Sequence, residues 1–296
     1  MAQAQPPERT LPAVVSSNGV DIRFDEQLFV PMHDSSDHLD DPGELRHNFE
    51  RDGYLLLRGA LDRDAALDLR GRYFALFPPV LLAPGTSPVD GVFSGTAPAG
   101  LPDYGTRGHP AYEFVRTPEF DAFTRRPELA AIAESILGGP VDLTPRRILR
   151  HFDNRSGRAS RAHVDYDYMD RGSDQLVTAW ITLGDCPIEC GGLIYLERSH
   201  GVERDQLDAL RSFTDRPADH RPVSNDLGRT ASTLGRRWAW TDYRAGDVVL
   251  HSPHTVHASL DNVSDVMRLS ADVRFRRSGT PADERWGGDW SADDGF

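Results

Sequence analysis

The amino-acid sequence predicts an α+β chain, mainly β, in which N-terminal helices precede a sandwich or jelly-roll core. Helix-like segments dominate the chain up to about residue 137. From residue 143 onward, short alternating runs are separated by turn-forming residues. Helices followed by six or more short strands are typical of a jelly roll or sandwich with flanking helices.

Three helices are expected before the strands. They cover about 43–52, about 64–77 with Asp64 as the N-cap, and about 127–137, which starts with Pro and ends at two glycines. Residues 80–110 are dense in Pro and Gly. This composition predicts a long irregular loop, a frequent location of functional residues.

Six runs are expected to form strands, namely RILRHF, LVTAWITL, GLIYLE, RWAWTDY, DVVLHS and RLSADVRF. Residues 201–236 interrupt the strands with a charged, helix-compatible stretch, which we interpret as an insertion or lid. A single domain is expected over 21–277. The flanking segments, 1–20 and 278–296, are expected to be flexible and loosely packed, respectively.

Composition and charge exclude several function classes. The net charge of −13 argues against a nucleic-acid binder. No apolar run approaches the roughly 18 residues of a membrane helix, and the N-terminus lacks the pattern of a secretion signal, so a cytoplasmic protein without membrane contact is expected. All 33 basic residues are arginine, which excludes Schiff-base and P-loop lysines. Cys186 and Cys190 lack the further ligands of a zinc site. The oligomeric state stays open.

The tripeptide His-x-Asp occurs three times, starting at His38, His151 and His163. On a strand, residues i and i+2 share a face, so such a tripeptide supplies two-thirds of a 2-His-1-carboxylate facial triad for non-haem Fe(II). His38 precedes every expected strand and is interpreted as incidental. His151 ends a strand and remains a competitor. His163 with Asp165 is preferred because aromatic residues and a strand follow.

The third ligand must come from a distant strand, and three histidines lie within 251–257. Only His257 is followed eleven residues later by an arginine, Arg268. The turn-forming residues 261–265 predict a hairpin that places Arg268 opposite or diagonal to Ser259, within roughly 8 Å of the metal-facing row. There the guanidinium is suited to bind the far carboxylate of a dicarboxylic acid. A structural ion pair is the alternative role.

The order of these segments resembles the phytanoyl-CoA dioxygenase family of Fe(II)- and 2-oxoglutarate-dependent oxygenases, over about residues 45–275. The matching stretches are FERDGYLLLRGAL, AHVDYDYM, TAWITLGDC, GGLIYLERSHG, AGDVVLHSPHTVHASLDN and MRLSADVRF. The resemblance implies a double-stranded β-helix (jelly-roll, cupin-like) core. It also implies an iron ion held by His163, Asp165 and His257.

The same resemblance implies that Arg268, Ser259 and Trp180 contact 2-oxoglutarate. The implied reaction consumes dioxygen and 2-oxoglutarate, releases succinate and carbon dioxide, and oxidises a substrate carbon, with ascorbate as the in vitro reductant. Hydroxylation is the commonest outcome in the family, although desaturation, epimerisation and ring closure use the same ligands. Asp165 disfavours halogenation, because the related halogenases lack that carboxylate.

The substrate is expected to be a small polar metabolite, modified in a tailoring step of bacterial antibiotic-type biosynthesis. Six arginines precede the metal motif, at positions 146, 147, 150, 155, 158 and 161. They predict either an anionic substrate or a solvated loop that balances nearby acids. The candidate substrate contacts are Tyr166, Tyr168, Arg150 and Arg107, and further aromatic candidates for a pocket wall are Trp238 and Trp240.

Two other function classes stay open at this level. A metal-dependent cupin isomerase or hydrolase would share the barrel and the metal but has no use for the arginine clamp. A non-catalytic jelly-roll binding module would need neither the metal ligands nor the clamp. Release of succinate from 2-oxoglutarate with Fe(II) and ascorbate distinguishes the oxygenase from both.

Overall fold

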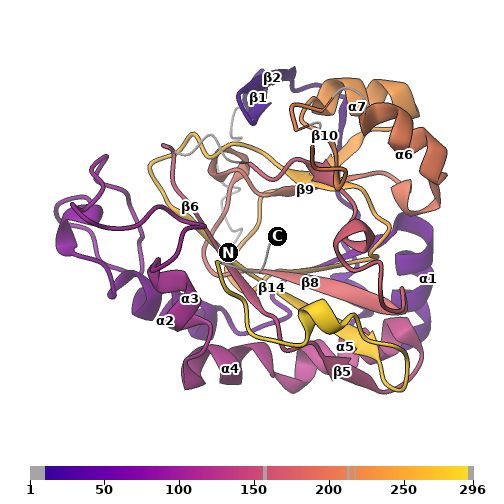
Figure 1. The fold of residues 1–296 in the computed structure, drawn as a ribbon, viewed down its shortest axis with the longest axis horizontal. Coiled ribbons are helices and arrows are strands. Elements are labelled where there is room, and N and C mark those ends of the chain that lie inside the picture. The colour runs from indigo at the N-terminus through magenta and orange to yellow at the C-terminus, as the bar shows by residue number, and fades with distance from the viewer. Residues whose placement is uncertain (1–10, 156–158, 212–213, 217, 293–296) are drawn as a thin grey trace, which may run out of the picture.

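Two six-stranded sheets form the centre of the computed structural model, which describes residues 11–155, 159–211, 214–216 and 218–292. The major sheet has the order β4 (Tyr54–Leu57), β12 (Val248–His251), β8 (Leu176–Thr182), β14 (Arg268–Arg277), β5 (Val141–Leu143), and β6 (Ile148–Phe152) also pairs with β14. The minor sheet has the order β10 (Pro222–Ser224), β7 (Ala162–His163), β13 (His257–Ser259), β9 (Leu193–Leu196), β11 (Trp238–Trp240), β3 (Phe29–Pro31). Figure 1 shows β9 and β10 above and β8 and β14 below.

From β6 to β14 the chain passes repeatedly from one sheet to the other. β6, β8, β12 and β14 belong to the major sheet, whereas β7, β9 and β13, which lie between them in the chain, belong to the minor sheet. The chain therefore winds as a double-stranded β-helix, which confirms the predicted jelly-roll core. All six predicted runs contain strands. The short strands β3, β5 and β10 escaped prediction, because three residues show too little alternation.

Helices from the first half of the chain pack on the outer face of the major sheet. They are α1 (Pro42–Asp52), α2 (Arg63–Phe74), α3 (Pro110–Phe114), α4 (Pro118–Thr124) and α5 (Pro127–Leu137). α1 and α5 match their predicted ranges closely. The predicted N-cap of α2 is wrong: Asp62, not Asp64, accepts a hydrogen bond from the Ala65 amide at 2.8 Å, so the helix starts and ends earlier.

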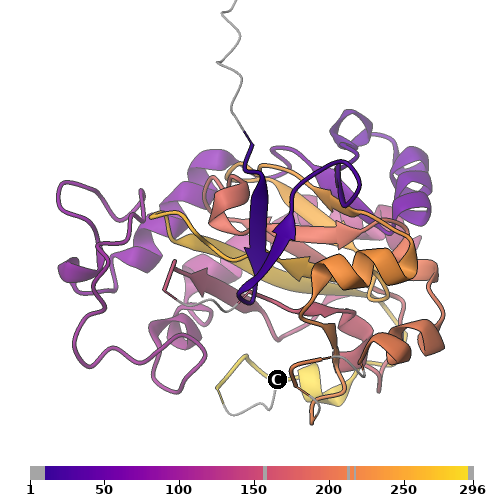
Figure 2. The same cartoon turned by 90° about the horizontal axis from the view of Figure 1, so that it is seen from above.

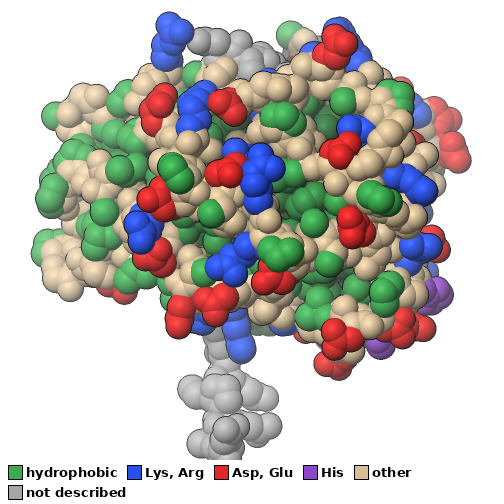
Figure 3. All heavy atoms as spheres, turned by 90° about the horizontal axis from the view of Figure 1, so that it is seen from below, with side chains coloured by type: hydrophobic (Ala, Val, Ile, Leu, Met, Phe, Trp, Pro, Cys, Tyr) green, Lys and Arg blue, Asp and Glu red, His purple; other side chains and the backbone are tan. Residues whose placement is uncertain are grey.

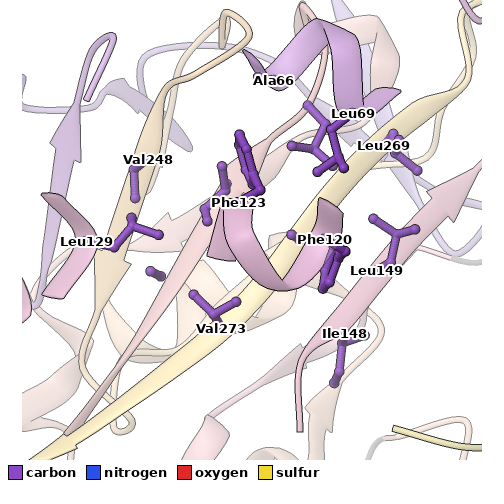
Figure 4. Close-up of a cluster of buried hydrophobic side chains, with 14 of the residues drawn as sticks. Ala66, Leu69, Phe120, Phe123, Leu129, Ile148, Leu149, Val248, Leu269 and Val273 are labelled. Atoms are coloured by element: carbon purple, nitrogen blue, oxygen red, sulfur yellow. The ribbon is translucent and has the colours of Figure 1, made fainter. Parts of the chain in front are cut away.

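Strand β14 separates the hydrophobic core from the interior of the barrel. Leu269 and Val273 belong to the same buried cluster as Phe120 of α4 (Figure 4). Side chains alternate in direction along a strand, so Arg268 and Arg274 point the other way, where both line a cavity between the sheets. The alternation read from RLSADVRF thus puts arginines, not apolar residues, inside the barrel.

An N-terminal hairpin packs on the minor sheet, where Ile22 belongs to the same hydrophobic cluster as Ile194 and Ala258. β1 (Val14–Ser17) and β2 (Val20–Arg23) pair with each other, and Figure 2 shows them in front of the sheets. The Ser17 hydroxyl is fully buried and donates a hydrogen bond to the Ser259 carbonyl at 2.8 Å. Residues 14–20, which belong to the segment expected to be flexible, therefore form regular structure that is bonded to the barrel. Residues 1–10 lie outside the described residues.

The insertion at 201–236 folds against the minor sheet. Its helices α6 (Arg204–Arg211) and α7 (Leu227–Leu234) share a hydrophobic cluster with that sheet, and its strand β10 pairs with β7. Asp215 forms an ion pair with Arg161 at 2.6 Å. The insertion therefore lies directly beside the strand that carries the first half of the metal motif.

The C-terminal segment differs from the loose tail expected from the sequence. Trp286 and Trp290 are only 3% and 8% exposed, and both belong to the main hydrophobic core. The 3-10 turn at Glu284–Trp286 brings the first indole inward. Apolar periodicity could not predict this packing, because the two tryptophans stand among Gly, Asp and Arg. Residues 293–296 lie outside the described part.

The outer surface mixes charges of both signs. On the face shown in Figure 3, acidic and basic side chains are interspersed among small apolar groups. Within the described residues, no helix combines the length and the apolar character needed to cross a membrane.

Candidate metal centre

Three predicted ligands meet at one point between the sheets. His163 ends β7, Asp165 starts a 3-10 turn directly after it, and His257 starts β13. β7 and β13 are neighbours, and His257 stands opposite His163. The intervening Val164 packs into the minor-sheet core, so its two neighbours turn toward the interior.

The three side chains have the geometry of a metal site. One ligand atom from each of His163, Asp165 and His257 lies within 4.8 Å of the others. The Nε2 atoms of His163 and His257 are 3.6 and 3.7 Å from Asp165 Oδ1. Bond lengths from a central ion of about 2.0–2.2 Å to each ligand fit this spacing.

Backbone carbonyls fix the tautomer of both histidines. The Nδ1 atom of His163 lies 2.7 Å from the Arg161 carbonyl, and that of His257 lies 2.9 Å from the Thr255 carbonyl. A carbonyl only accepts hydrogen bonds, so each Nδ1 carries the proton and each Nε2 keeps a lone pair for a metal. Burial, then the charges of neighbouring histidines, hold the pKa of His257 well below its usual range, which keeps its ring neutral.

Three residues of the major sheet surround the second oxygen of Asp165. Thr178 donates to Oδ2 at 2.5 Å, Arg274 approaches it at 3.3 Å, and His251 Nε2 lies 3.5 Å away. Burial alone would raise the pKa of Asp165, but the charge of Arg274 and the neighbouring histidines hold it well below its usual range. Asp165 is therefore ionised, with Oδ1 turned toward the two histidines.

The supporting residues Thr178, Arg274 and His251 were missed in the sequence. A signal existed for two of them. Arg274 continues the alternation of β14 beyond Asp272, and His251 stands opposite Thr178 on the neighbouring strand.

Among the described residues, the competing motif His151-x-Asp153 belongs to no group that could hold a metal ion. The His151 ring lies among aromatic side chains, with Nδ1 3.0 Å from the Tyr73 hydroxyl and Nε2 3.3 Å from the Met267 sulfur. Asp153 is paired with Arg155. His38 lies in a short 3-10 turn (Ser36–His38) between β3 and α1, and it is not among the residues that could hold a metal ion within the described part of the chain.

A small cavity adjoins the three ligands. It is lined by Arg150, Ser160, His163, Asp165, Thr178, Trp180, Leu193, His251, His257, Arg268, Asp272 and Arg274. Two of the three candidate co-substrate residues, Arg268 and Trp180, thus lie along it. Ser259 does not line it, because its hydroxyl oxygen accepts the Ser160 amide at 2.7 Å.

Arg268 is a buried cation at the end of this cavity. It is 3% exposed, its guanidinium lies 4.3 Å above the Phe152 ring, and one nitrogen donates to the Gly191 carbonyl. Within the described residues it forms no ion pair, and its Nε lacks a hydrogen-bond partner. Burial lowers the pKa of Arg268. A buried guanidinium of this kind is suited to a carboxylate supplied by a ligand.

A larger cavity of about 400 Å³ opens on the other side of the metal ligands. It is lined by Asn18, Tyr104, Gly105, Tyr112, Arg146, Ile148, Arg150, Phe152, Ala159, Ser160, Arg161, His163, Asp165, Tyr168, Arg216, Pro222, Arg274, Trp286, Trp290, Ser291 and Ala292. Residues from the helical half, the barrel, the insertion and the C-terminal segment therefore enclose one space beside the metal centre.

The candidate substrate residues divide into two groups. Tyr168 and Arg150 line the large cavity. Tyr166 packs on His254 instead, and Arg107 is exposed outside the cavity.

The two tryptophans of β11 also lie away from the cavity. Trp238 is fully buried and donates to the Leu227 carbonyl at 2.9 Å, and Trp240 packs edge-on against Phe24. They belong to the side of the minor sheet that α7 covers.

Comparison with known proteins decides the family. The family model described as phytanoyl-CoA dioxygenase (PhyH) matches residues 49–270. The chain belongs to the phytanoyl-CoA dioxygenase family. It is therefore a 2-oxoglutarate-dependent non-haem iron dioxygenase, and Fe(II) and 2-oxoglutarate are its cofactor and co-substrate.

Individual relatives agree with this family. The chain is 26% identical over 256 residues to 1-deoxypentalenic acid 11-beta-hydroxylase of Streptomyces exfoliatus, which covers 80% of this chain and 82% of the relative. Its fold is similar to that of the epimerase SnoN in complex with Fe3+, alpha ketoglutarate and nogalamycin RO (TM-score 0.57, 18% identity, 82% and 86% of the two chains). It is also similar to the carbocyclase SnoK from nogalamycin biosynthesis (TM-score 0.56, 19% identity, 89% and 92%).

A dioxygenase of this family must bind 2-oxoglutarate, and Gly191 offers a test of how Arg268 does so. Gly191 has φ +72°, and a Cβ atom there would lie 2.4 Å from the Leu260 carbonyl. Gly191→Ala is expected to displace the carbonyl that holds Arg268 and to raise KM for 2-oxoglutarate about tenfold, the equivalent of one lost hydrogen bond to a charged group. Steady-state kinetics with varied 2-oxoglutarate measures the effect.

Gly235→Ala is the matched control for that substitution. Gly235 also has a positive φ, +62°, but a Cβ there meets nothing within 4 Å. It is expected to lower stability by about 1–2 kcal/mol while KM for 2-oxoglutarate stays unchanged. Equal KM values in the two variants would show that the Gly191 carbonyl does not position Arg268.

Proposed function

We propose that this chain hydroxylates an aliphatic carbon of a small, negatively charged metabolite, in a tailoring step of bacterial antibiotic-type biosynthesis. The observation that carries the proposal is the cavity of about 400 Å³, whose lining includes the metal ligands His163 and Asp165. Its size falls within the range of small-molecule pockets, roughly 300–1,000 Å³. A substrate bound there lies beside the metal, as oxidation of one of its carbons requires.

The charges around the cavity favour an anionic substrate. Its lining includes five arginines, Arg146, Arg150, Arg161, Arg216 and Arg274. Among the described lining residues, Asp165 is the only acid, and in this proposal it binds the metal. Two of the five are paired with acids outside the lining, Arg150 with Asp272 at 2.7 Å and Arg161 with Asp215 at 2.6 Å. In a chain of net charge −13, this concentration of guanidinium groups is still local, and it favours a ligand of negative charge.

Each group of residues then has a role. His163, Asp165 and His257 would hold the iron, which with 2-oxoglutarate and dioxygen supplies the oxidising power. Arg268 would anchor the far carboxylate of 2-oxoglutarate. The insertion at 201–236, which contributes Arg216 and Pro222 to the cavity, would cover the substrate and exclude water.

The relatives support hydroxylation and the biosynthetic setting. The hydroxylase relative acts, by its name, on an acid, 1-deoxypentalenic acid. SnoN and SnoK are an epimerase and a carbocyclase of nogalamycin biosynthesis. These three enzymes are named for different reactions. We base the proposal of hydroxylation on the hydroxylase, because its sequence identity to this chain, 26%, is higher than the 18% and 19% of the other two.

Two measurements test this function. With Fe(II) and ascorbate, the protein is expected to release succinate from 2-oxoglutarate slowly alone and faster with an accepted substrate. Under ¹⁸O₂, a hydroxylated product is expected to carry one labelled oxygen. A product without the label would point to epimerisation, desaturation or ring closure, and absence of succinate under all conditions would contradict the oxygenase function.

A further inference from the structure

The C-terminal segment forms a wall of the large cavity, although the family model ends at residue 270. Trp286, Trp290 and the two residues that follow line this space. The Trp286 indole nitrogen donates to the Tyr168 carbonyl at 3.0 Å, and the Trp290 ring packs 4.2 Å from that of Tyr112. These contacts attach the segment to the turn that carries Asp165 and to helix α3.

Two arginines lie against the same indole. The guanidinium of Arg274 is 4.4 Å, and that of Arg146 is 5.1 Å, from the Trp286 ring centre. Both side chains line the large cavity and are 3% and 6% exposed, respectively. The Trp286 indole therefore holds two guanidinium groups at the wall of the large cavity, and each of them is suited to bind an anionic group.

Arg274 retains hydrogen-bonding capacity for such an anion. One of its terminal nitrogens approaches the outer oxygen of Asp165 at 3.3 Å. Its Nε and its other terminal nitrogen are buried and have no hydrogen-bond partner within the described residues. Buried donors of this kind are nearly always satisfied by a ligand or water.

We propose that Arg146 and Arg274, held on the Trp286 indole, bind a carboxylate of the substrate. This inference rests on the proposed function, because it assigns the charged end of the same substrate. The planar fork of a guanidinium matches a carboxylate with two parallel hydrogen bonds. Tyr104 and Phe152 offer the remaining wall to a ring-shaped apolar skeleton.

The position of this site determines how the substrate lies. Arg274 contacts both the Trp286 ring and the metal ligand Asp165, so a carboxylate bound there is fixed beside the metal centre. The carboxylate therefore decides which carbon faces the metal. Through Trp286, the C-terminal segment therefore affects both how tightly the substrate binds and which of its carbons is oxidised.

Arg146 is the residue on which the test depends. Arg274 also lines the small cavity beside the metal, so its replacement would disturb metal and co-substrate binding, whereas Arg146 lines only the large one. Arg155 is the matched control: it belongs to the same arginine-rich stretch but pairs with Asp153 and lines a neighbouring cavity. Arg158 lies outside the described residues.

The probes are adamantane-1-carboxylate, its neutral analogue adamantane-1-carboxamide, and inorganic phosphate. Binding to the full chain with Fe(II) and 2-oxoglutarate, without oxygen, is measured by tryptophan fluorescence and by calorimetry. The wild type and Arg155→Gln are expected to bind the carboxylate at least about tenfold more tightly than the amide. Arg146→Gln is expected to lose this preference, and Arg146→Lys to recover part of it. Thermal melting confirms that each variant is folded.

Three outcomes would overturn the assignment. They are equal binding of carboxylate and amide by the wild type, an undiminished preference in Arg146→Gln, and displacement of the carboxylate by an equal concentration of phosphate, which would make the site a phosphate receptor. The succinate assay remains separate. Carboxylate preference without succinate release refutes the oxygenase function, whereas succinate release without carboxylate preference refutes only this site.

Discussion

Replacement of His163, Asp165 or His257 by alanine is expected to abolish succinate formation while the fold is retained. Each variant leaves two ligands where the geometry provides three. Mutation of a residue that only orients a metal ligand typically lowers metal affinity or activity by about 10–100-fold. Removal of a ligand itself should therefore lower iron affinity and activity by more than about 100-fold. Iron content after dialysis and the rate of succinate release measure the two consequences directly.

His151→Ala is the matched control, because it removes a histidine from the competing motif. The substitution leaves the buried Tyr73 hydroxyl without its partner, so stability is expected to fall by about 1–3 kcal/mol. Iron content and turnover per folded molecule should stay near the wild-type values. Normal turnover in His163→Ala combined with loss in His151→Ala would show that the metal is bound by the other motif.

The candidate metal ligands could be proposed from the sequence because their signal, a His-x-Asp tripeptide, is local. A tripeptide on a strand follows from the two-residue period of a β-strand. The predicted hairpin about residues 261–265 is wrong, because β13 pairs with β7 and β9 in the minor sheet whereas β14 pairs with β5, β6 and β8 in the major sheet. The same period correctly placed Arg268 inside the barrel. It did not place Ser259 correctly at the cavity, because the Ser160 amide, which comes from the loop before β7, occupies its hydroxyl oxygen.

The substrate cavity was predicted less well, because long-range contacts build it. Arg155 and Arg161 stand in the arginine-rich stretch, yet Asp153 and Asp215 pair with them. The residues around Trp286 show no apolar periodicity that would predict its burial. Trp286 reaches the cavity because the segment after β14 folds back over the barrel. Sequence patterns report the direction of side chains within an element, not which distant segment covers them.

Arg268→Ala is expected to weaken 2-oxoglutarate binding by about 2–5 kcal/mol, roughly 30-fold to several thousand-fold in Kd. The guanidinium is 3% exposed and lacks an acidic partner among the described residues, so the bound carboxylate would be its counter-ion. Truncation leaves that carboxylate buried without a partner, whereas Arg268→Lys keeps the charge and loses the two-pronged geometry. KM for 2-oxoglutarate should therefore rise steeply in the first variant and less in the second.

Arg147→Gln separates this effect from the general cost of removing a buried arginine. Arg147 is also nearly buried, but its guanidinium bonds to Asp121 at 2.6 Å and to Thr124 at 2.9 Å, within the helical half. Its replacement should lower the melting temperature without changing KM for 2-oxoglutarate. An unchanged KM in Arg268→Ala, with iron still bound, would mean that another group holds the far carboxylate. The clamp would then have to be sought among Arg150 and Arg274, the other arginines of the small cavity.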